Sequence, residues 1–260
     1  MMMLAAVRRA PEASLPVAVY AAGSSHLTKT PRPNPRIILV SVLQQRLDEV
    51  ERRIRDAGAR AGRPRESITL IAVTKKFATS VIRDAYAAGL RHFGENYVQE
   101  FEQKAPELSD LSGAVFHLIG HLQSNKARRA AELFAWIETV DSVRLAHRLE
   151  QTGRPLDVMI EVKLSEEEAK SGAGATGLPG IVDALRASSL LRLHGLMTMP
   201  PWSENPEDSR PYFRRLKELA DRHALPSLSM GMSHDLEVAV EEGATHLRIG
   251  TALFGRRPKE

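Results

Sequence analysis

The segment ITLIAVTKKFATS, residues 68–80, sets the pattern from which the fold is predicted. Its first six residues are largely apolar and mostly β-branched, which is typical of a parallel strand that is buried on both faces. The strand is expected to end at two adjacent cations, Lys75 and Lys76, ahead of a helical pattern. A buried strand that ends in charge raises the question of what these lysines face.

Strand-like and helix-like segments alternate along the rest of the chain, which predicts parallel pairing because parallel strands need crossover connections. Eight strands in 260 residues predict a single (β/α)8 TIM barrel. An open, doubly wound sheet is the alternative, but it normally carries a glycine-rich turn after its first strand, and here that turn has no glycine. The expected strands are 68–73, 90–94, 115–120, 136–140, 156–162, 191–197, 226–230 and 245–250.

Residues 1–38 differ from the rest of the chain because they are rich in Ala, Pro and Ser and show no sustained period. We therefore expect a disordered N-terminal extension over 1–38 and one barrel domain over 39–260. The extension is basic and poor in acidic residues, as targeting peptides are, but it lacks a clean apolar stretch followed by a cleavage site. A plain tail or an over-long start of the reading frame is the simpler interpretation.

The composition argues against several classes of function. The absence of cysteine excludes disulfides, a thiol nucleophile and a cysteine-ligated metal. The absence of cysteine also fits a reducing compartment, and a cytoplasmic protein is expected. No apolar run is long enough to span a membrane. The net charge is only +4 and aromatic residues make up 5%, so nucleic-acid binding is not expected. His117 and His121 lack the H-E-x-x-H pattern, and no metal site is expected.

Polar side chains follow most of the expected strands at their C-terminal ends, whereas the opposite ends offer far fewer. In a barrel of this type the site lies at the C-terminal ends of the strands. We therefore expect one site there, built from loops that are far apart in the sequence. The candidates are Lys75, Lys76, Glu95, Asn96, Tyr97, His121, Gln123, Ser124, Asn125, Thr198, Met199, Ser229, Met230, Gly231, Met232, Ser233, Arg248, Gly250 and Thr251.

The last two loops, SMGMS (229–233) and RIGT (248–251), suggest a phosphate site. Barrels often bind phosphate with the loops after strands seven and eight, and these loops supply hydroxyls and glycines. For Ser233, capping of the following helix is an equally good interpretation. A lysine opposite a phosphate suggests a Schiff base, because a desolvated lysine amine is a nucleophile. Strand alternation does not choose between Lys75 and Lys76.

Arg248 lies within an apolar strand, between Leu247 and Ile249. An unpaired guanidinium would be costly there, so Arg248 is expected to have a partner. An arginine is one of the known partners of the pyridine nitrogen of pyridoxal phosphate (PLP). The lysine, the phosphate loops and the arginine together therefore point to this cofactor.

Seven motifs extend this interpretation: AVTKK, FGENYVQE, HLIGHLQSNK, EAKSG, GLMTM, SMGMS and RIGTALFG. In this order and at this spacing they resemble the PLP homeostasis proteins, also called the YggS or PROSC family, over about residues 41–255. The resemblance implies a single (β/α)8 barrel like the N-terminal domain of alanine racemase and other fold-type III PLP enzymes. It also implies PLP as the cofactor.

The same resemblance implies a role for individual residues. Lys75 would carry the cofactor as a covalent aldimine, and Lys76 would be peripheral. Arg248 would face the pyridine nitrogen. The phosphate would be held by Ser229, Ser233, Gly250 and Thr251, and the ring would be lined by Asn96, His121 and Met230.

The function implied by the resemblance is control of the PLP pool and delivery of the cofactor, without robust turnover. Arginine stays protonated and cannot protonate the ring nitrogen, and an unprotonated ring is a poorer electron sink. The racemases also use a base from an additional domain, for which a chain that ends at Glu260 has no room. A monomer is expected, with apo-PLP enzymes as recipients. The alternatives are a PLP-dependent amino-acid racemase or lyase, and an aldolase-type barrel that binds a sugar phosphate.

Overall fold

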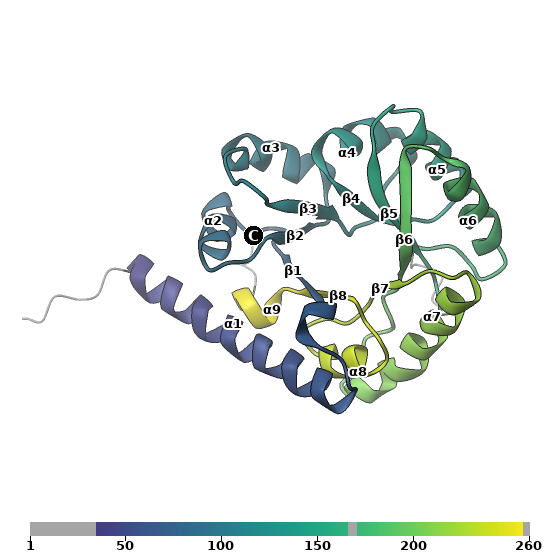
Figure 1. Ribbon diagram of the computed structural model, residues 1–260. Helices are drawn as coiled ribbons and strands as arrows, with labels where there is room; N and C mark the ends of the chain where they lie inside the picture. Colours follow the sequence, from purple (N-terminus) through teal and green to yellow (C-terminus); the bar gives the residue numbers. More distant parts are fainter. Residues whose placement is uncertain (1–34, 166–170, 257–260) are drawn as a thin grey trace, which may run out of the picture. The chain divides into compact units, whose positions relative to one another are not determined.

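The computed structural model describes residues 35–165 and 171–256. Strands β1 to β8 form one closed barrel in sequence order, and β8 pairs with β1. Every neighbouring pair is parallel. Figure 1 shows the helices on the outside of this barrel. The strands are β1 (Thr69–Val73), β2 (His92–Glu95), β3 (Val115–Leu118), β4 (Trp136–Val140), β5 (Leu156–Glu161), β6 (Leu191–Met197), β7 (Ser227–Ser229) and β8 (His246–Ile249).

The closed parallel barrel confirms the predicted (β/α)8 fold and excludes the open, doubly wound sheet. Each of the eight strands begins and ends within two residues of its expected limits. Short 3-10 turns precede β1, α4 and α7. The helices are α1 (Pro35–Arg60), α2 (Thr79–Ala87), α3 (Val98–Leu108), α4 (Ala127–Leu133), α5 (Val143–Glu150), α6 (Leu178–Ala187), α7 (Arg210–Arg222), α8 (Leu236–Glu241) and α9 (Thr251–Phe254).

Helix α1 begins at Pro35, before the point near Val42 where its helical spacing becomes regular in the sequence. The expected N-terminal extension lies outside the described residues as far as residue 34, whereas residues 35–38 belong to α1. Leu47 and Ile54 lie on the inner face of the helix and are buried. Because α1 contacts α8 and α9, it covers the outside of the barrel near the junction of the first and last strands.

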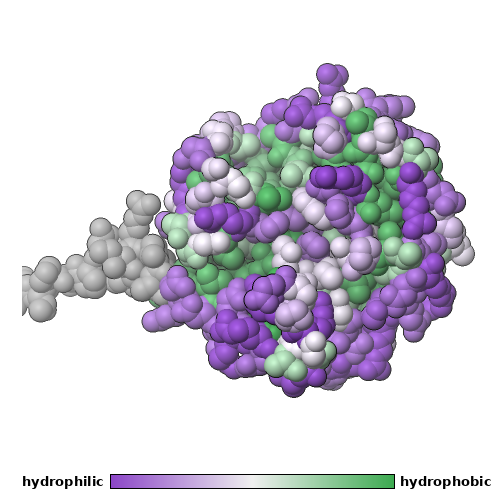
Figure 2. Space-filling view, viewed as in Figure 1, coloured by the Kyte–Doolittle hydropathy of each residue, from purple (hydrophilic) through white to green (hydrophobic). Residues whose placement is uncertain are grey.

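The strands are buried on both faces, as the apolar runs predict. In β1, Leu70 and Ala72 join the apolar cluster between the sheet and the helices. Ile71 is fully buried but lies outside that cluster, because alternate side chains of a strand point into the barrel. In Figure 2 hydrophilic residues dominate the periphery, and hydrophobic residues are concentrated further inward.

The barrel interior near the start of several strands is richer in polar and aromatic groups than the sequence analysis expected. The Trp136 ring lies 5.3 Å from the ring of His117, 4.5 Å from that of His194 and 5.4 Å from that of His246, between centroids. The expectation of few polar residues at this end was wrong. Strands that are apolar on their outer face can still place single polar side chains inside the barrel.

Two kinds of feature were sought among the described residues. None of their helices combines the length and the apolar character that crossing a membrane requires. In the same part of the chain, no three His, Asp or Glu side chains are grouped so that they could hold a metal ion.

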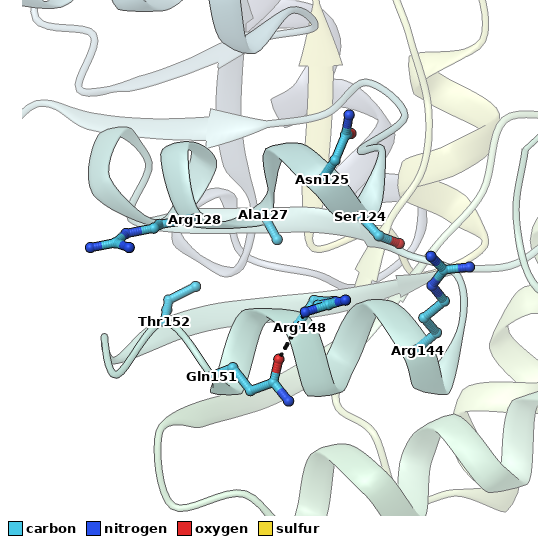
Figure 3. A pocket seen from close by; sticks show the side chains of 8 residues that line it. All are labelled: Ser124, Asn125, Ala127, Arg128, Arg144, Arg148, Gln151 and Thr152. Carbon is cyan, nitrogen blue, oxygen red and sulfur yellow. Dashed lines mark hydrogen bonds between the residues drawn. The ribbon is translucent and has the colours of Figure 1, made fainter.

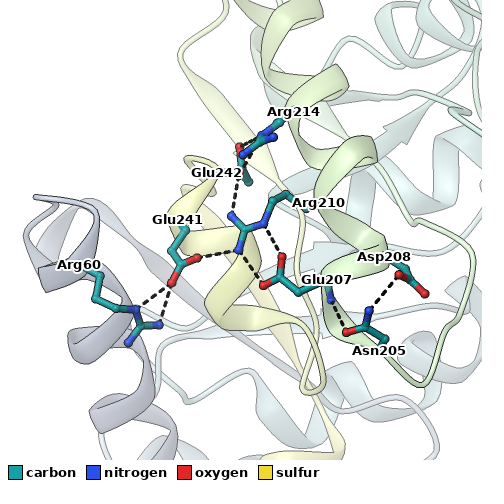
Figure 4. A network of polar contacts seen from close by, with 8 residues as sticks. All are labelled: Arg60, Asn205, Glu207, Asp208, Arg210, Arg214, Glu241 and Glu242. Carbon is teal, nitrogen blue, oxygen red and sulfur yellow. Dashed lines mark hydrogen bonds and ion pairs between the residues drawn. The ribbon is translucent and has the colours of Figure 1, made fainter.

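A network of ion pairs joins three of the outer helices (Figure 4). Arg210, at the start of α7, donates to Glu207 at 2.6 Å, to Glu241 at 2.8 Å and to Glu242 at 2.6 Å. Glu241 in turn pairs with Arg60 of α1 at 2.8 Å. Arg210 is therefore the central cation of a cluster that links α1, α7 and α8.

We predict that Arg210→Met lowers the free energy of unfolding by about 1–2 kcal/mol, because it leaves three neighbouring carboxylates without their shared cation. The loss should shrink in 1 M salt, which screens the repulsion between them. Urea unfolding at low and high salt measures both effects. As a control, Arg215→Met removes an exposed pair with Glu218 and should cost no more than about 0.5 kcal/mol. Equal losses in the two variants would contradict the prediction.

Candidate functional site

A pocket of about 220 Å³ opens at the C-terminal ends of the strands, where the fold predicts a site. We call it the strand-end pocket. Lys75 reaches it from the end of β1 and Gly250 from the end of β8, so barrel closure joins opposite ends of the domain. Six of the nine residues to which the resemblance gives a role line it, together with the candidates Met199 and Met232: Lys75, Asn96, Ser233, Arg248, Gly250 and Thr251.

A tight turn presents Lys75 to this pocket. The backbone N–H of Phe77 donates to the carbonyl oxygen of Thr74 at 3.1 Å, which closes a turn with the two lysines at its centre. Lys76 has φ 64°, a left-handed conformation that non-glycine residues rarely adopt. Lys75 is half-buried and lines the pocket, whereas Lys76 is exposed. The turn therefore distinguishes the two lysines, between which strand alternation in the sequence did not choose.

A buried ion pair braces the backbone on both sides of the pocket lysine. Lys104 of α3 donates to Glu95 at 3.0 Å and to the carbonyl oxygen of Thr74 at 3.1 Å. The hydroxyl of Thr74 donates to the same Glu95 oxygen at 2.7 Å. Lys104 also pairs with Glu100, which accepts the backbone N–H of Lys76 at 2.5 Å. Burial raises the pKa of Glu95, and the charge of Lys104 opposes that rise.

Arg248 has the partners that its place in an apolar strand requires. Its guanidinium is almost fully buried and donates to Ser229 Oγ at 2.6 Å and to the carbonyl oxygen of Thr198 at 2.8 Å. Burial lowers the pKa of Arg248, but a guanidinium still keeps its proton in a protein. Because Arg248 also lines the strand-end pocket, it offers a fixed positive charge and hydrogen-bond donors to a ligand.

The loops after β7 and β8 form one wall of the pocket. Ser233 Oγ accepts the backbone N–H of Ala252 at 3.1 Å, which ties the two loops together. The residue at the N-cap of α8 is Asp235 rather than Ser233. Gly231 has φ 90°, and a Cβ there would lie 2.4 Å from Cβ of Ala239. The tight path of this loop therefore requires glycine.

Asn96 brings an unsatisfied acceptor to the pocket. Its Oδ1 is buried and has no hydrogen-bond partner among the described residues. The loop is held closely, because a Cβ at Gly120 would lie only 2.3 Å from the carbonyl oxygen of Asn96. A buried acceptor without a partner is costly, which favours a ligand that donates a hydrogen bond there.

Three of the nine residues to which the resemblance gives a role do not line the pocket. Ser229 is fully buried below it, and its hydroxyl is engaged by Arg248 and Glu138. Met230 belongs to the apolar cluster between the sheet and the helices, because its side chain alternates with that of Ser229. His121 lies at the surface with half of its side chain exposed, beside an aspartate. These positions lend no support to contacts of the three side chains with a ligand in the pocket.

The sequence analysis missed four residues that line the pocket: Val73, Ile119, Trp202 and His234. Trp202 is one of only two tryptophans in the chain and follows two prolines in the loop after β6, which is the signal that was available. Its side chain is 76% exposed. Trp202 therefore places an exposed aromatic ring at the rim of the pocket.

A larger hollow, of about 540 Å³, lies between the start of α4 and helix α5. Figure 3 shows Arg128 on one side and Arg144 and Arg148 on the other. Ser124 and Asn125, which follow β3, line this hollow rather than the strand-end pocket. Its three arginines are exposed, and exposed charges interact weakly because water screens them. The strand-end pocket is therefore the better candidate for the functional site.

Comparisons with known proteins cover most of the chain. A family model described as alanine racemase, N-terminal domain, matches residues 45–258. The pyridoxal phosphate homeostasis protein of Pseudomonas aeruginosa is 44% identical over 224 residues, 84% of this chain and 97% of that protein. The chain belongs to the pyridoxal phosphate homeostasis protein family. The Escherichia coli K12 member is 42% identical over 222 residues, 81% of this chain and 95% of that protein.

Solved structures agree with this family and fold. PipY of Synechococcus elongatus, solved with PLP bound, is 39% identical with a TM-score of 0.71, over 82% of this chain and 100% of that chain. Alanine racemase of Corynebacterium glutamicum is 20% identical with a TM-score of 0.61, over 84% of this chain and 61% of that chain. The family that the motifs indicated and the barrel of the alanine racemase N-terminal domain are both confirmed.

Glu161, at the end of β5, is a second buried carboxyl in this region. It is 3% exposed, and its Oε2 has no hydrogen-bond partner among the described residues. Burial raises the pKa of Glu161 to about 7; Arg248 lowers it and Asp141 raises it. In the unfolded chain this carboxyl loses its proton near its ordinary pKa, 4.5. The unfolded state therefore binds fewer protons between these values, and stability falls as pH rises from about 4.5 to about 7.

We predict that Glu161→Gln removes this loss, because glutamine has no proton to release. Relative to the wild type, the variant should gain about 1–3 kcal/mol of unfolding free energy on going from pH 4.5 to pH 8. Urea unfolding of the cofactor-free protein at several pH values measures the difference. Glu218→Gln, at an exposed position, is the control and should show no such trend. A pH-independent difference for the buried variant would contradict the assignment.

Proposed function

We propose that the chain binds PLP in the strand-end pocket and acts in PLP homeostasis by holding and delivering the cofactor, without robust turnover. The observation that carries the proposal is the meeting of Lys75 and Arg248 in one pocket. The names of the relatives and the PLP-bound structure of PipY support it.

The residues that line the pocket fit this cofactor. PLP supplies an aldehyde, to which the amine of Lys75 would bond covalently as water is lost. Arg248 would donate to the ring nitrogen, and Asn96 would present its unpartnered acceptor beside the ring. The phosphate would lie against the wall formed by Ser233, Gly250 and Thr251.

The chemistry of Arg248 supports a binding role without robust turnover. A guanidinium donates hydrogen bonds but has no proton that it can release to the ring nitrogen. An unprotonated ring withdraws electrons weakly, so it stabilises a carbanion poorly. The site is therefore suited to retaining the cofactor more than to using it.

Delivery needs an accessible cofactor, and the rim of the pocket is open. Trp202 and Met199 line it with 76% and 39% of their surfaces exposed. We include in this proposal a cytoplasmic monomer that hands PLP to apo-PLP enzymes. Size-exclusion chromatography with light scattering tests the monomer, and activation of an apo-enzyme by the loaded protein tests the handover.

We predict that the purified protein takes up added PLP with a visible absorption band, and that borohydride fixes a pyridoxyl group on Lys75. Lys75→Ala should lose the covalent label, because the amine is gone. Lys76→Ala should keep it, because Lys76 is exposed and does not line the pocket. Peptide mapping by mass spectrometry locates the label.

Two results would count against this assignment. A label that persists in Lys75→Ala would move the covalent site to another lysine. A protein that binds no PLP, and that borohydride traps only with a carbonyl substrate, would favour the aldolase-type barrel instead.

We also predict that the PLP-loaded protein turns over a panel of L- and D-amino acids no faster than free PLP does. Chiral chromatography of the products detects racemisation, and keto-acid assays detect lyase activity. Multiple turnovers of any one amino acid above the rate of free PLP would favour the alternative, a PLP-dependent racemase or lyase.

A further inference from the structure

The positive charge of Arg248 is buried without a direct carboxylate partner. Among the residues that the structure describes, its guanidinium bonds only to Ser229 Oγ and to the carbonyl oxygen of Thr198. Burying a permanent charge is costly unless an anion compensates it nearby. A carboxylate lies one hydrogen bond further away, beyond Ser229.

The anion that a hydrogen-bonded path connects to it is Glu138, on the opposite side of the barrel in β4. Asp235 and Glu161 are further carboxyls whose charges act on Arg248, but neither is hydrogen-bonded to its guanidinium. The hydroxyl of Ser229 donates its single proton to Glu138 Oε2 at 2.6 Å. Ser229 Oγ also accepts a hydrogen bond from the guanidinium of Arg248, through a lone pair and again at 2.6 Å. Ser229 and Glu138 are both fully buried. One hydroxyl therefore connects the cation to the carboxylate, and the direction of both bonds is fixed.

The other oxygen of Glu138 is held from the far side. His117 Nδ1 lies 2.8 Å from Glu138 Oε1, and His92 Nδ1 lies 2.9 Å from His117 Nε2. Burial by itself would raise the pKa of Glu138, but the hydrogen bond from His117 and the charges of His117, His246 and Arg248 lower it overall. An ionised carboxylate only accepts hydrogen bonds, so His117 Nδ1 is the donor. Glu138 thus remains an anion with both oxygens occupied.

We propose that Glu138 and Ser229 are positioning residues of the cofactor site, which orient the guanidinium of Arg248 and balance its charge. The inference rests on the proposed function, because Arg248 would use its remaining N–H donors for the ring nitrogen of PLP. A guanidinium has five such donors, and the bonds to Ser229 and Thr198 occupy two of them. Held at two points, the planar group has a fixed orientation, so the directions of its remaining N–H donors are fixed as well.

The physical effect has two parts. Without the carboxylate, the hydroxyl of Ser229 is free to rotate, and the guanidinium loses a fixed partner. The site also becomes more positive, because one buried negative charge is gone. The first change weakens cofactor binding, and the second changes the pH at which the bound cofactor releases a proton.

The test compares Glu138→Gln and Ser229→Ala with a matched control. Asp157 is a mostly buried carboxylate at the start of β5 that bonds to Arg192 and His194 and has no part in the chain to Arg248. PLP titrations followed by visible absorbance give the affinity. We expect PLP to bind about 10-fold more weakly to Glu138→Gln and about 3-fold to 10-fold more weakly to Ser229→Ala, with less than about a 2-fold change in Asp157→Asn.

The pH dependence of the visible band separates positioning from general loss of structure. In Glu138→Gln its midpoint should fall by about 0.5–1 pH unit, because a more positive site favours loss of the proton. Ser229→Ala should shift it less, since the carboxylate stays. Should Glu138→Gln fail to fold, Ser229→Ala alone decides the outcome, as it removes only one oxygen atom.

A readout on the cofactor-free protein completes the experiment. With nitrogen-labelled arginine, the guanidinium N–H signals of Arg248 should exchange with water faster in both variants than in the wild type. If the wild type binds PLP and both variants keep its affinity, its band midpoint and its N–H exchange rate, this inference alone is overturned. A wild-type protein that binds no PLP would overturn the proposed function and this inference with it.

Discussion

The pairing of β1 with β8 is the constraint on which the site depends. Its register places Ile71 beside Arg248, so the end of the first strand lies next to the end of the last. Lys75 follows the one and Thr251 follows the other, and both line the same pocket. In an open sheet these strands would be free to lie at different edges. Closure of the barrel therefore creates the site, while the loops supply its chemistry.

Closure also makes a confined interior, and that interior is charged. Arg248 must lie there to reach the pocket, and Glu138 compensates it through Ser229. All three residues are buried and hydrogen-bonded, which is the condition under which a buried ion pair is tolerated. A second buried pair, Lys104 with Glu95, braces the turn that carries the pocket lysine. The two networks hold the two charged groups of the site from different sides.

Much of the architecture was readable from local pattern. Buried parallel strands are apolar runs, and their ends are marked by polar loops, so strand order and the general location of the site could be predicted. Side chains within a strand were harder to assign. Ser229 and Met230 are neighbours in sequence, yet one faces Arg248 and the other faces the helices. His121 follows the third strand as expected, but its loop turns outward and leaves its side chain at the surface.

The sequence by itself determined the number and order of the strands, the family to which the chain belongs, and the presence of a lysine and an arginine at the strand ends. The resemblance to the family already favoured Lys75 over Lys76, but only the tertiary structure gave the physical reason: the left-handed turn at Lys76 leaves Lys75 alone of the two at the pocket. The tertiary structure also decided that Ser229 connects Arg248 to the carboxylate of Glu138. Periodicity reports the neighbours of a residue along the chain, whereas contacts across a barrel depend on the stagger of its strands.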